Sequence, residues 1–237
     1  MAAPSAALFR FMVVLLGVTL LIEHSAEAVA FEFAFEFTNS AQGTSGGDRF
    51  DKEIGKGGAL EIMNSSTKFI WKTFRQQSPA SRKKVNTVSL IVESMNGIAY
   101  TNGDEIHFSA EYVADYTKDV KAEIRGVMYH EMTRVWQWDG HGNAPGGLIE
   151  GFADYVRLTA GLAPSHWVKP GSGDRWDHGY EVTAYFLQYC ESIRPGFVAK
   201  MNAKLASGWD LGYFNALTGK SVDQLWKDYK AKYSSGT

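Results

Sequence analysis

The sequence predicts an α+β fold. Patterns of period two, which are typical of strands, occupy the first half of the chain, and patterns with helical spacing dominate from Val120 onward. With 237 residues, 45% hydrophobic and 21% charged, the chain resembles ordinary globular proteins and is long enough for one domain with a sizeable core. We therefore expect an N-terminal mixed or antiparallel sheet followed by a helical half.

The first thirty residues differ in kind from the rest. Arg10 precedes an uncharged apolar run of twelve residues, and two small-x-small triplets follow, ending at Ala28 and Ala30. This order is typical of a secretory signal peptide, whereas a membrane anchor needs about eighteen apolar residues. We predict a signal peptide over residues 1–28, with cleavage after Ala30 as the alternative, a single domain over 29–237, and no membrane association once the signal is removed.

Three strand patterns precede the helical half. Residues 31–38 alternate phenylalanine with acidic or small side chains, so this strand should face the core through its phenylalanines. Residues 88–93 and 106–112 are predicted as further strands, with a short segment at 98–100 between them. Asn-Gly pairs, which favour tight turns, lie on both sides of that segment.

The remaining segments are predicted as helices and loops. A run rich in Gly, Ser and Thr over 42–47 is a loop, and apolar spacing from Leu60 to Phe74 predicts a helix. Residues 161–179, rich in Gly, Pro, Trp and His, are expected to form an ordered loop near a functional face. The helices predicted for the second half cover residues 120–138, 148–160, 180–192, 195–204 and 222–232.

Charge and cysteine content exclude several classes of protein. Removing residues 1–28 takes one of 24 basic and two of 26 acidic side chains, which leaves 23 and 24, so nothing indicates a nucleic-acid partner. Cys190 is the sole cysteine, so no internal disulfide forms; its apolar helical surroundings favour a buried, inert thiol over a nucleophile. Asn64 begins the glycosylation sequon Asn-Ser-Ser. We expect a monomer.

One helical segment resembles a zinc-peptidase motif with one ligand changed. His130 and Glu131 begin a His-Glu-Met-Thr-Arg sequence that ends at Arg134. In HExxH the two histidines lie on the same face of a helix and hold Zn²⁺, while the glutamate activates its water. Arginine offers no lone pair to a metal, so Arg134 puts zinc binding in doubt.

A second helix carries two carboxylates in an apolar setting. Glu150 and Asp154 are one turn apart on the same face, and both charges need a partner. A metal and its histidine ligand would supply one. The alternative is that Glu150 is a carboxylate favoured by the dipole at the N-terminus of its helix. The residues alone do not favour either interpretation of Glu150, as a metal ligand or as a carboxylate at a helix N-terminus.

Longer stretches around these motifs resemble the plant basic secretory protein family, the peptidases of plants and bacteria. The resemblance covers essentially the whole mature chain. It implies a zincin-like fold, zinc as cofactor, a peptide or protein substrate, an extracellular location in the apoplast and an association with plant defence. The stretches that carry it are residues 102–110, 129–140, 144–158, 163–170, 173–176 and 223–230.

The resemblance implies a role for each residue that matches the family's motif. His130 and Glu150 would be zinc ligands, and Glu131 would be the general base that deprotonates the zinc-bound water. Asp154 would hydrogen-bond His130 and orient it. Because the family has histidine where this chain has Arg134, we expect zinc binding and peptide hydrolysis to be impaired.

Two further roles follow from the same chemistry. A hydrogen-bond donor to the transition state is needed; Tyr180 is our candidate, with His166 and His178 as alternatives. The strand over 106–112 would be the edge strand along which an extended peptide adds. The residues assigned to substrate binding are Ile106, His107, Phe108 and Trp167.

Arg134 suggests two alternatives to a working zinc site. In our hypothesis its guanidinium fills the metal's place and bridges Glu131 and Glu150. Alternatively His141, eleven residues after His130, replaces the missing ligand, although its glycine-flanked turn is more typical of a flexible surface loop.

The alternative function is a catalytically inactive, defence-related protein that binds a peptide or cell-wall carbohydrate in the former peptidase cleft. Aromatic side chains near the motif would stack on sugar rings in the carbohydrate case. We prefer the interpretation that they pack the motif helix against the loop over 161–179. The aromatic residues in question are Trp136, Trp138, Trp167, Trp176 and Tyr180.

Overall fold

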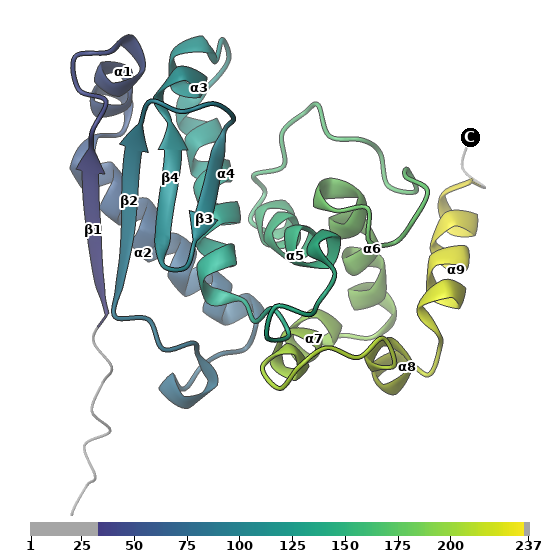
Figure 1. Ribbon diagram of the computed structural model, residues 1–237. Coiled ribbons are helices and arrows are strands. Elements are labelled where there is room, and N and C mark those ends of the chain that lie inside the picture. The colour runs from purple at the N-terminus through teal and green to yellow at the C-terminus, as the bar shows by residue number, and fades with distance from the viewer. Residues whose placement is uncertain (1–32, 235–237) are drawn as a thin grey trace, which may run out of the picture. The chain divides into compact units, whose positions relative to one another are not determined.

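Four strands in the order β1-β2-β4-β3 form the sheet of the computed structural model, which describes residues 33–234 (Figure 1). Strands β1, β2 and β4 are parallel, and β3 runs antiparallel to β4. The expected mixed sheet is therefore confirmed. The strand bounds are β1 Ala34–Asn39, β2 Thr87–Glu93, β3 Ala99–Asn102 and β4 Glu105–Ser109.

Helices account for most of the remaining described residues. Those expected in the second half are confirmed to within a few residues, which makes the fold α+β. The helix bounds are α1 Ser45–Glu53, α2 Gly55–Thr73, α3 Ala110–Asp115, α4 Val120–Trp136, α5 Gly146–Thr159, α6 Tyr180–Ile193, α7 Phe197–Leu205, α8 Tyr213–Thr218 and α9 Val222–Ser234, with a 3₁₀ turn at Pro79–Ser81.

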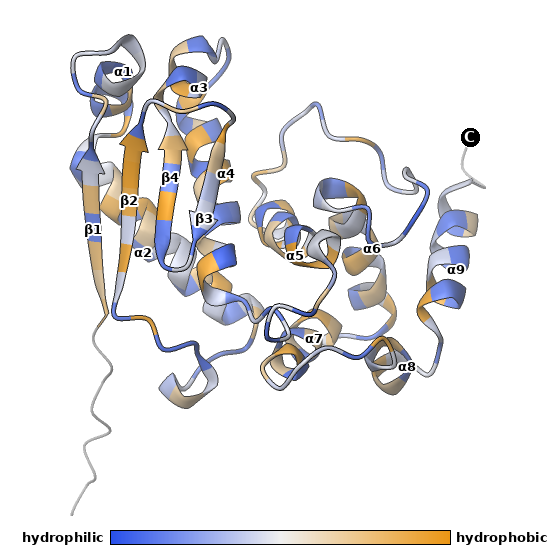
Figure 2. Cartoon of the chain, in the orientation of Figure 1, coloured by the Kyte–Doolittle hydropathy of each residue, from blue (hydrophilic) through white to orange (hydrophobic). Residues whose placement is uncertain are grey.

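The core lies between the sheet and two long helices. Alternate side chains of β2 and β4 are fully buried, and Figure 2 shows β2 coloured mainly hydrophobic. Helices α2 and α4 cover the buried face of the sheet (Figure 1). Phe33, Phe35 and Phe37 are partly buried and pack against this core, as the alternation predicted.

Helix α1 replaces part of the predicted loop over 42–47. Thr44 caps this helix, because its side chain accepts a hydrogen bond from the Gly47 N–H. A Cβ atom at Gly46 would lie 1.8 Å from the Ala110 carbonyl oxygen. These glycines therefore serve close packing rather than flexibility, and the loop prediction was wrong at this point.

The prediction that residues 106–112 form an edge strand is also wrong. Ser109 ends β4 and caps α3, since its Oγ accepts a hydrogen bond from the Tyr112 N–H at 3.1 Å. Strand β4 pairs with β2 on one side and with β3 on the other. The edge strand on this side of the sheet is β3, which pairs antiparallel along the outer side of β4, and β1 is the edge strand on the other side.

Helix α5 packs between α4 and α6. A Cβ atom at Gly151 would lie 2.3 Å from Thr183 Cγ2, so glycine is needed where α5 meets α6. Cys190 of α6 is buried, as predicted, and burial raises the pKa of its thiol. Within residues 33–234, no helix combines the length and apolar character needed to cross a membrane. The predicted signal peptide lies outside the described residues.

Candidate active site

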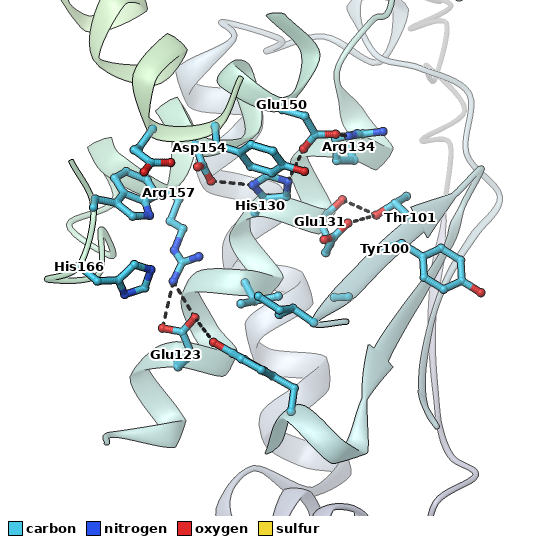
Figure 3. A pocket seen from close by; sticks show the side chains of 17 residues that line it. Tyr100, Thr101, Glu123, His130, Glu131, Arg134, Glu150, Asp154, Arg157 and His166 are labelled. Carbon is cyan, nitrogen blue, oxygen red and sulfur yellow. Dashed lines mark hydrogen bonds and ion pairs between the residues drawn. The ribbon is translucent and has the colours of Figure 1, made fainter. Parts of the chain in front are cut away.

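A cavity of about 490 Å³ lies between β3, α4, α5 and the loop that leads to α6 (Figure 3). It brings together most of the residues singled out in the sequence. Those that line it are His130, Glu131, Arg134, Glu150, Asp154, His166, Trp167 and Tyr180. Residues far apart in the chain therefore meet at one site, as the motif predicted.

Four side chains form a continuous series across α4 and α5, which we call the motif network (Figure 3). The His130 ring faces a carboxylate on each side: Nδ1 is 2.7 Å from Asp154 Oδ1, and Nε2 is 3.0 Å from Glu150 Oε2. The other oxygen of Glu150 forms an ion pair with Arg134 Nη1. The order along the network is Asp154, His130, Glu150, Arg134, which places cationic or proton-donating groups next to each carboxylate.

Glu131 has a different partner from the one our hypothesis gave it. Its Oε2 accepts a hydrogen bond from Thr101 Oγ1 at 2.6 Å, and among residues 33–234 it has no ion-pair partner. Arg134 therefore does not bridge Glu131 and Glu150. Among residues 33–234 the Arg134 guanidinium pairs only with Glu150, and Thr101 of β3 supplies a neutral donor to Glu131.

The donor set does not fit a zinc ion. His130 Nε2 and Glu150 Oε2, the two expected ligand atoms that this chain retains, are hydrogen-bonded to each other. Arg134 occupies the second histidine position and holds the remaining Glu150 oxygen, and its guanidinium has no lone pair for a metal. Residues 33–234 contain no group of three or more His, Cys, Asp or Glu side chains placed to hold a metal ion.

The alternative ligand and one alternative donor lie away from the cavity. His141 sits on an exposed turn with its Nε2 3.0 Å from the Ala206 carbonyl oxygen, and it does not line the site. His178 pairs instead with Asp174 at 3.1 Å on the surface. Neither residue lines the cavity.

Tyr180 lies over the motif network. Its ring is nearly parallel to that of His130, at 16°, with the ring centroids 6.1 Å apart. The residue has a φ of 46°, in the left-handed region that non-glycine residues seldom adopt, and it is 54% exposed. This conformation at the start of α6 places the ring at the mouth of the cavity, and the role of donor remains a prediction.

The substrate-binding residues assigned to β4 are not at the cavity. Ile106 and Phe108 are fully buried in the core. His107 lies on the opposite face of the sheet, where its Nδ1 is 2.7 Å from Glu93 Oε1 and its ring stacks on Tyr100. Because β4 is a central strand, none of its three assigned residues lines the cavity, whereas Trp167, the fourth residue assigned, does.

Sequence reasoning missed the strand residues that do line the cavity. These come from β3 and the residue before it: Ile98, Ala99, Tyr100 and Thr101. The Asn-Gly pairs at Asn96 and Asn102 were the available signal, since they mark a short strand that turns back along its neighbour.

A second charged group, missed in the sequence, lines the same cavity (Figure 3). Arg157 Nη2 is 3.1 Å from both carboxylate oxygens of Glu123. The hydroxyls of Tyr112 and Tyr116 donate to the same carboxylate at 3.0 and 3.2 Å. Burial, followed by the charge of Glu123, raises the pKa of both tyrosines. We call these four residues the Glu123 network.

The aromatic residues proposed as a sugar platform do not share one surface. Trp136 is buried against Phe33 and Trp71, whereas Trp176 packs against Trp209 and Phe214. The site contains Trp167 and Tyr180, and Trp138 packs partly buried against the core. Trp136 therefore packs toward β1 and α2 rather than toward the loop over 161–179. The sequon residue Asn64 is exposed on α2, away from the cavity.

Comparison with known proteins identifies related sequences. The family model described as peptidase of plants and bacteria matches residues 30–229. A basic secretory protease from Boswellia serrata is 43% identical to this chain over 58 residues. That match covers 24% of this chain and 66% of the relative, slightly less than two thirds of the relative's length. No solved structure matches the chain.

Proposed function

Because the chain belongs to the family of peptidases of plants and bacteria, we propose that it is a secreted, defence-associated protein with a zincin-like peptide cleft whose zinc binding and hydrolysis are impaired. The relative named a basic secretory protease supports the extracellular location. The observation that carries the proposal is the ion pair between Arg134 and Glu150.

This ion pair opposes metal binding in two ways. Arg134 removes a ligand from the position where the family has histidine, and a site with one ligand fewer holds zinc less strongly. It also holds Glu150, so a metal would have to break a charge-assisted hydrogen bond before it gained its carboxylate ligand. The guanidinium thus supplies positive charge that a metal would otherwise bring.

Three features of the cleft support the binding of a peptide. Strand β3 is at the edge of the sheet, so an extended segment can add to it through main-chain hydrogen bonds. Ile98 and Tyr100 are exposed beside this edge, and Tyr180 lies across the cavity from it. None of these features depends on a metal, so the cleft supports a second function, peptide recognition without hydrolysis.

Zinc stoichiometry of the purified mature protein tests the proposal. We expect the natural chain to carry little zinc and the Arg134→His variant to carry about one ion per chain, because a histidine at this position completes the HExxH ligand pair. Peptide cleavage by the variant should then stop when a chelator is added. A His130→Ala, Arg134→His double variant is the matched control and should lose the ion. About one zinc in the natural chain, together with cleavage that a chelator stops, would contradict the proposal.

A further inference from the structure

We infer that the cleft selects a ligand with a cationic nitrogen, and that Glu131 is the residue that binds it. The ligand is a peptide whose lysine or arginine side chain, or whose N-terminal ammonium group, lies against this carboxylate. The inference rests on the proposed peptide recognition and adds the chemical class of the ligand.

Glu131 differs from the other three carboxylates that α4 and α5 contribute to the cavity. Each of the other three faces a cationic or protonatable group within the chain: Glu123 faces Arg157, Glu150 faces Arg134, and Asp154 faces His130. Glu131 has no ion-pair partner among the described residues, and a threonine hydroxyl is its side-chain donor. The protein thus leaves one buried negative charge for a ligand to neutralise.

Burial makes this charge a strong site for a cation. Glu131 is 7% exposed, and a buried carboxylate without a cation is costly because it has lost most of its water. Its Oε1 accepts no hydrogen bond from residues 33–234, and it is not among the fully buried atoms that lack a partner. Since Glu131 lines the cavity, this oxygen is available to a donor that enters the site.

The position of Glu131 suits a peptide bound along the edge strand. Thr101 of β3 is 2.6 Å from the carboxylate, so the charge lies directly beside the free edge (Figure 3). A strand added to that edge would run about 4.8 Å from β3, within reach of Glu131 for a side chain or a terminal ammonium.

Two further features of the cavity favour a cation. Tyr180 offers an exposed aromatic face at the mouth of the site, and such a face attracts ammonium and guanidinium groups. Glu181, also in the lining, has no ion-pair partner in the described part of the chain and adds a second negative charge. Arg134 does not compete for Glu131, because Glu150 holds it.

Peptide binding measured by calorimetry, with EDTA present to keep the site free of metal, tests the inference. The probes are acetyl-Ala-Ala-Lys-Ala-Ala-amide, the same peptide with norleucine in place of lysine, and unacetylated Ala-Ala-Ala-Ala-Ala-amide beside its acetylated form. We expect a cationic peptide to bind at least about tenfold more tightly than its neutral partner. A difference between the lysine and norleucine peptides would show that the site binds a side-chain ammonium group. A difference between the unacetylated and acetylated peptides would show that it binds the N-terminal ammonium group.

The Glu131→Gln variant should abolish this preference, so that a cationic peptide and its neutral partner bind it equally; glutamine still accepts the hydrogen bond from Thr101. The matched control is Glu105→Gln, on the opposite face of the sheet, which should keep the preference; chemical denaturation verifies that both variants fold. Equal binding of cationic and neutral peptides, or a preference that survives in Glu131→Gln, overturns the inference while peptide recognition stands. No binding of any peptide overturns both.

Discussion

Two charged networks join α4 to α5 along the same cavity, and they are built in opposite ways. In the Glu123 network the ion pair is deeply buried, with side-chain exposures of 5% for Glu123 and 9% for Arg157. In the motif network the ion pair at the outer end is more open, at 28% for Arg134 and 21% for Glu150. The helices are the same, so the difference comes from the partners that surround each pair.

The Glu123 network is complete within the chain. Both carboxylate oxygens of Glu123 accept from Arg157, and each also accepts from a tyrosine hydroxyl. Gly126 leaves room for the guanidinium, since a Cβ atom there would lie 2.7 Å from Arg157 Nε. A network whose groups are all satisfied holds the fold together and offers little to a ligand.

Next to the motif network, one carboxylate is left with unused hydrogen-bonding capacity. Glu131, adjacent in sequence to His130, keeps one oxygen without a donor among residues 33–234. Arg134 carries a charge at the position where the HExxH motif has its second histidine. Burial and charge alone therefore do not distinguish the carboxylates of this cavity; Glu131 differs from Glu123 in its unfilled hydrogen-bonding capacity.

Replacing Arg157 breaks the complete network and is the largest effect that we expect. Arg157→Met leaves the Glu123 carboxylate buried without a cation, which should lower the free energy of unfolding by about 3–5 kcal/mol. Urea denaturation followed by circular dichroism measures the loss. The double variant Glu123→Gln, Arg157→Met should recover part of it, because the charge is gone and the tyrosines keep an acceptor. A single variant as stable as the natural chain would refute the structural role of this pair.

Removing Arg134 breaks the motif network at a smaller cost. Arg134→Ala should lower the free energy of unfolding by about 1 kcal/mol or less, because the pair is partly exposed and Glu150 keeps His130 as a partner. The same denaturation assay compares it with Arg157→Met. If the two variants lose equal stability, the motif network is as important to the fold as the Glu123 network, and the contrast between them fails.

The sequence predicted the helical half well because its signals are local. Helical spacing located α4, α5 and α6 to within a few residues, and the motif brought His130, Glu150 and Asp154 to one place. The helices follow from the 3.6-residue period, whereas the meeting of His130, Glu150 and Asp154 was what the resemblance to the family implied.

Neither the order of the strands in the sheet nor the Glu123 network could be predicted from these local signals. The identity of the edge strand depends on long-range pairing, so nothing in the pattern of residues 106–112 shows that β3 lies outside β4. Likewise Glu123 and Arg157 meet across two helices, 34 residues apart, without a recognisable spacing. Helix α1 was missed because a glycine-rich composition is typical of a loop. Here the glycines are needed instead for close packing.

At alkaline pH the Glu123 network should lose stability while the motif network does not. We expect this effect on the free energy of unfolding to be smaller than the effects of Arg157→Met and Arg134→Ala. Burial and the charge of Glu123 raise the pKa of Tyr112 above its usual value near 10. A raised folded-state pKa means that the stabilisation is present below about pH 10 and is lost as the pH rises through the folded value. The Tyr112 hydroxyl therefore makes the free energy of unfolding of the natural chain fall more steeply above pH 10 than that of Tyr112→Phe.

The two slopes should differ by roughly a few tenths of a kcal/mol per pH unit. This is well below the limit of about 1.4 kcal/mol per pH unit for one full proton, because Tyr112 is partly exposed to solvent. Denaturation in urea between pH 8 and pH 11 measures it, with Tyr100→Phe as the control, since Tyr100 is exposed and donates to no carboxylate among the described residues. Equal slopes for the natural chain and Tyr112→Phe would mean that the Tyr112 hydroxyl does not couple to Glu123. The motif network contains no tyrosine hydroxyl bonded to a carboxylate, so Arg134→Ala should leave the alkaline slope of the natural chain intact.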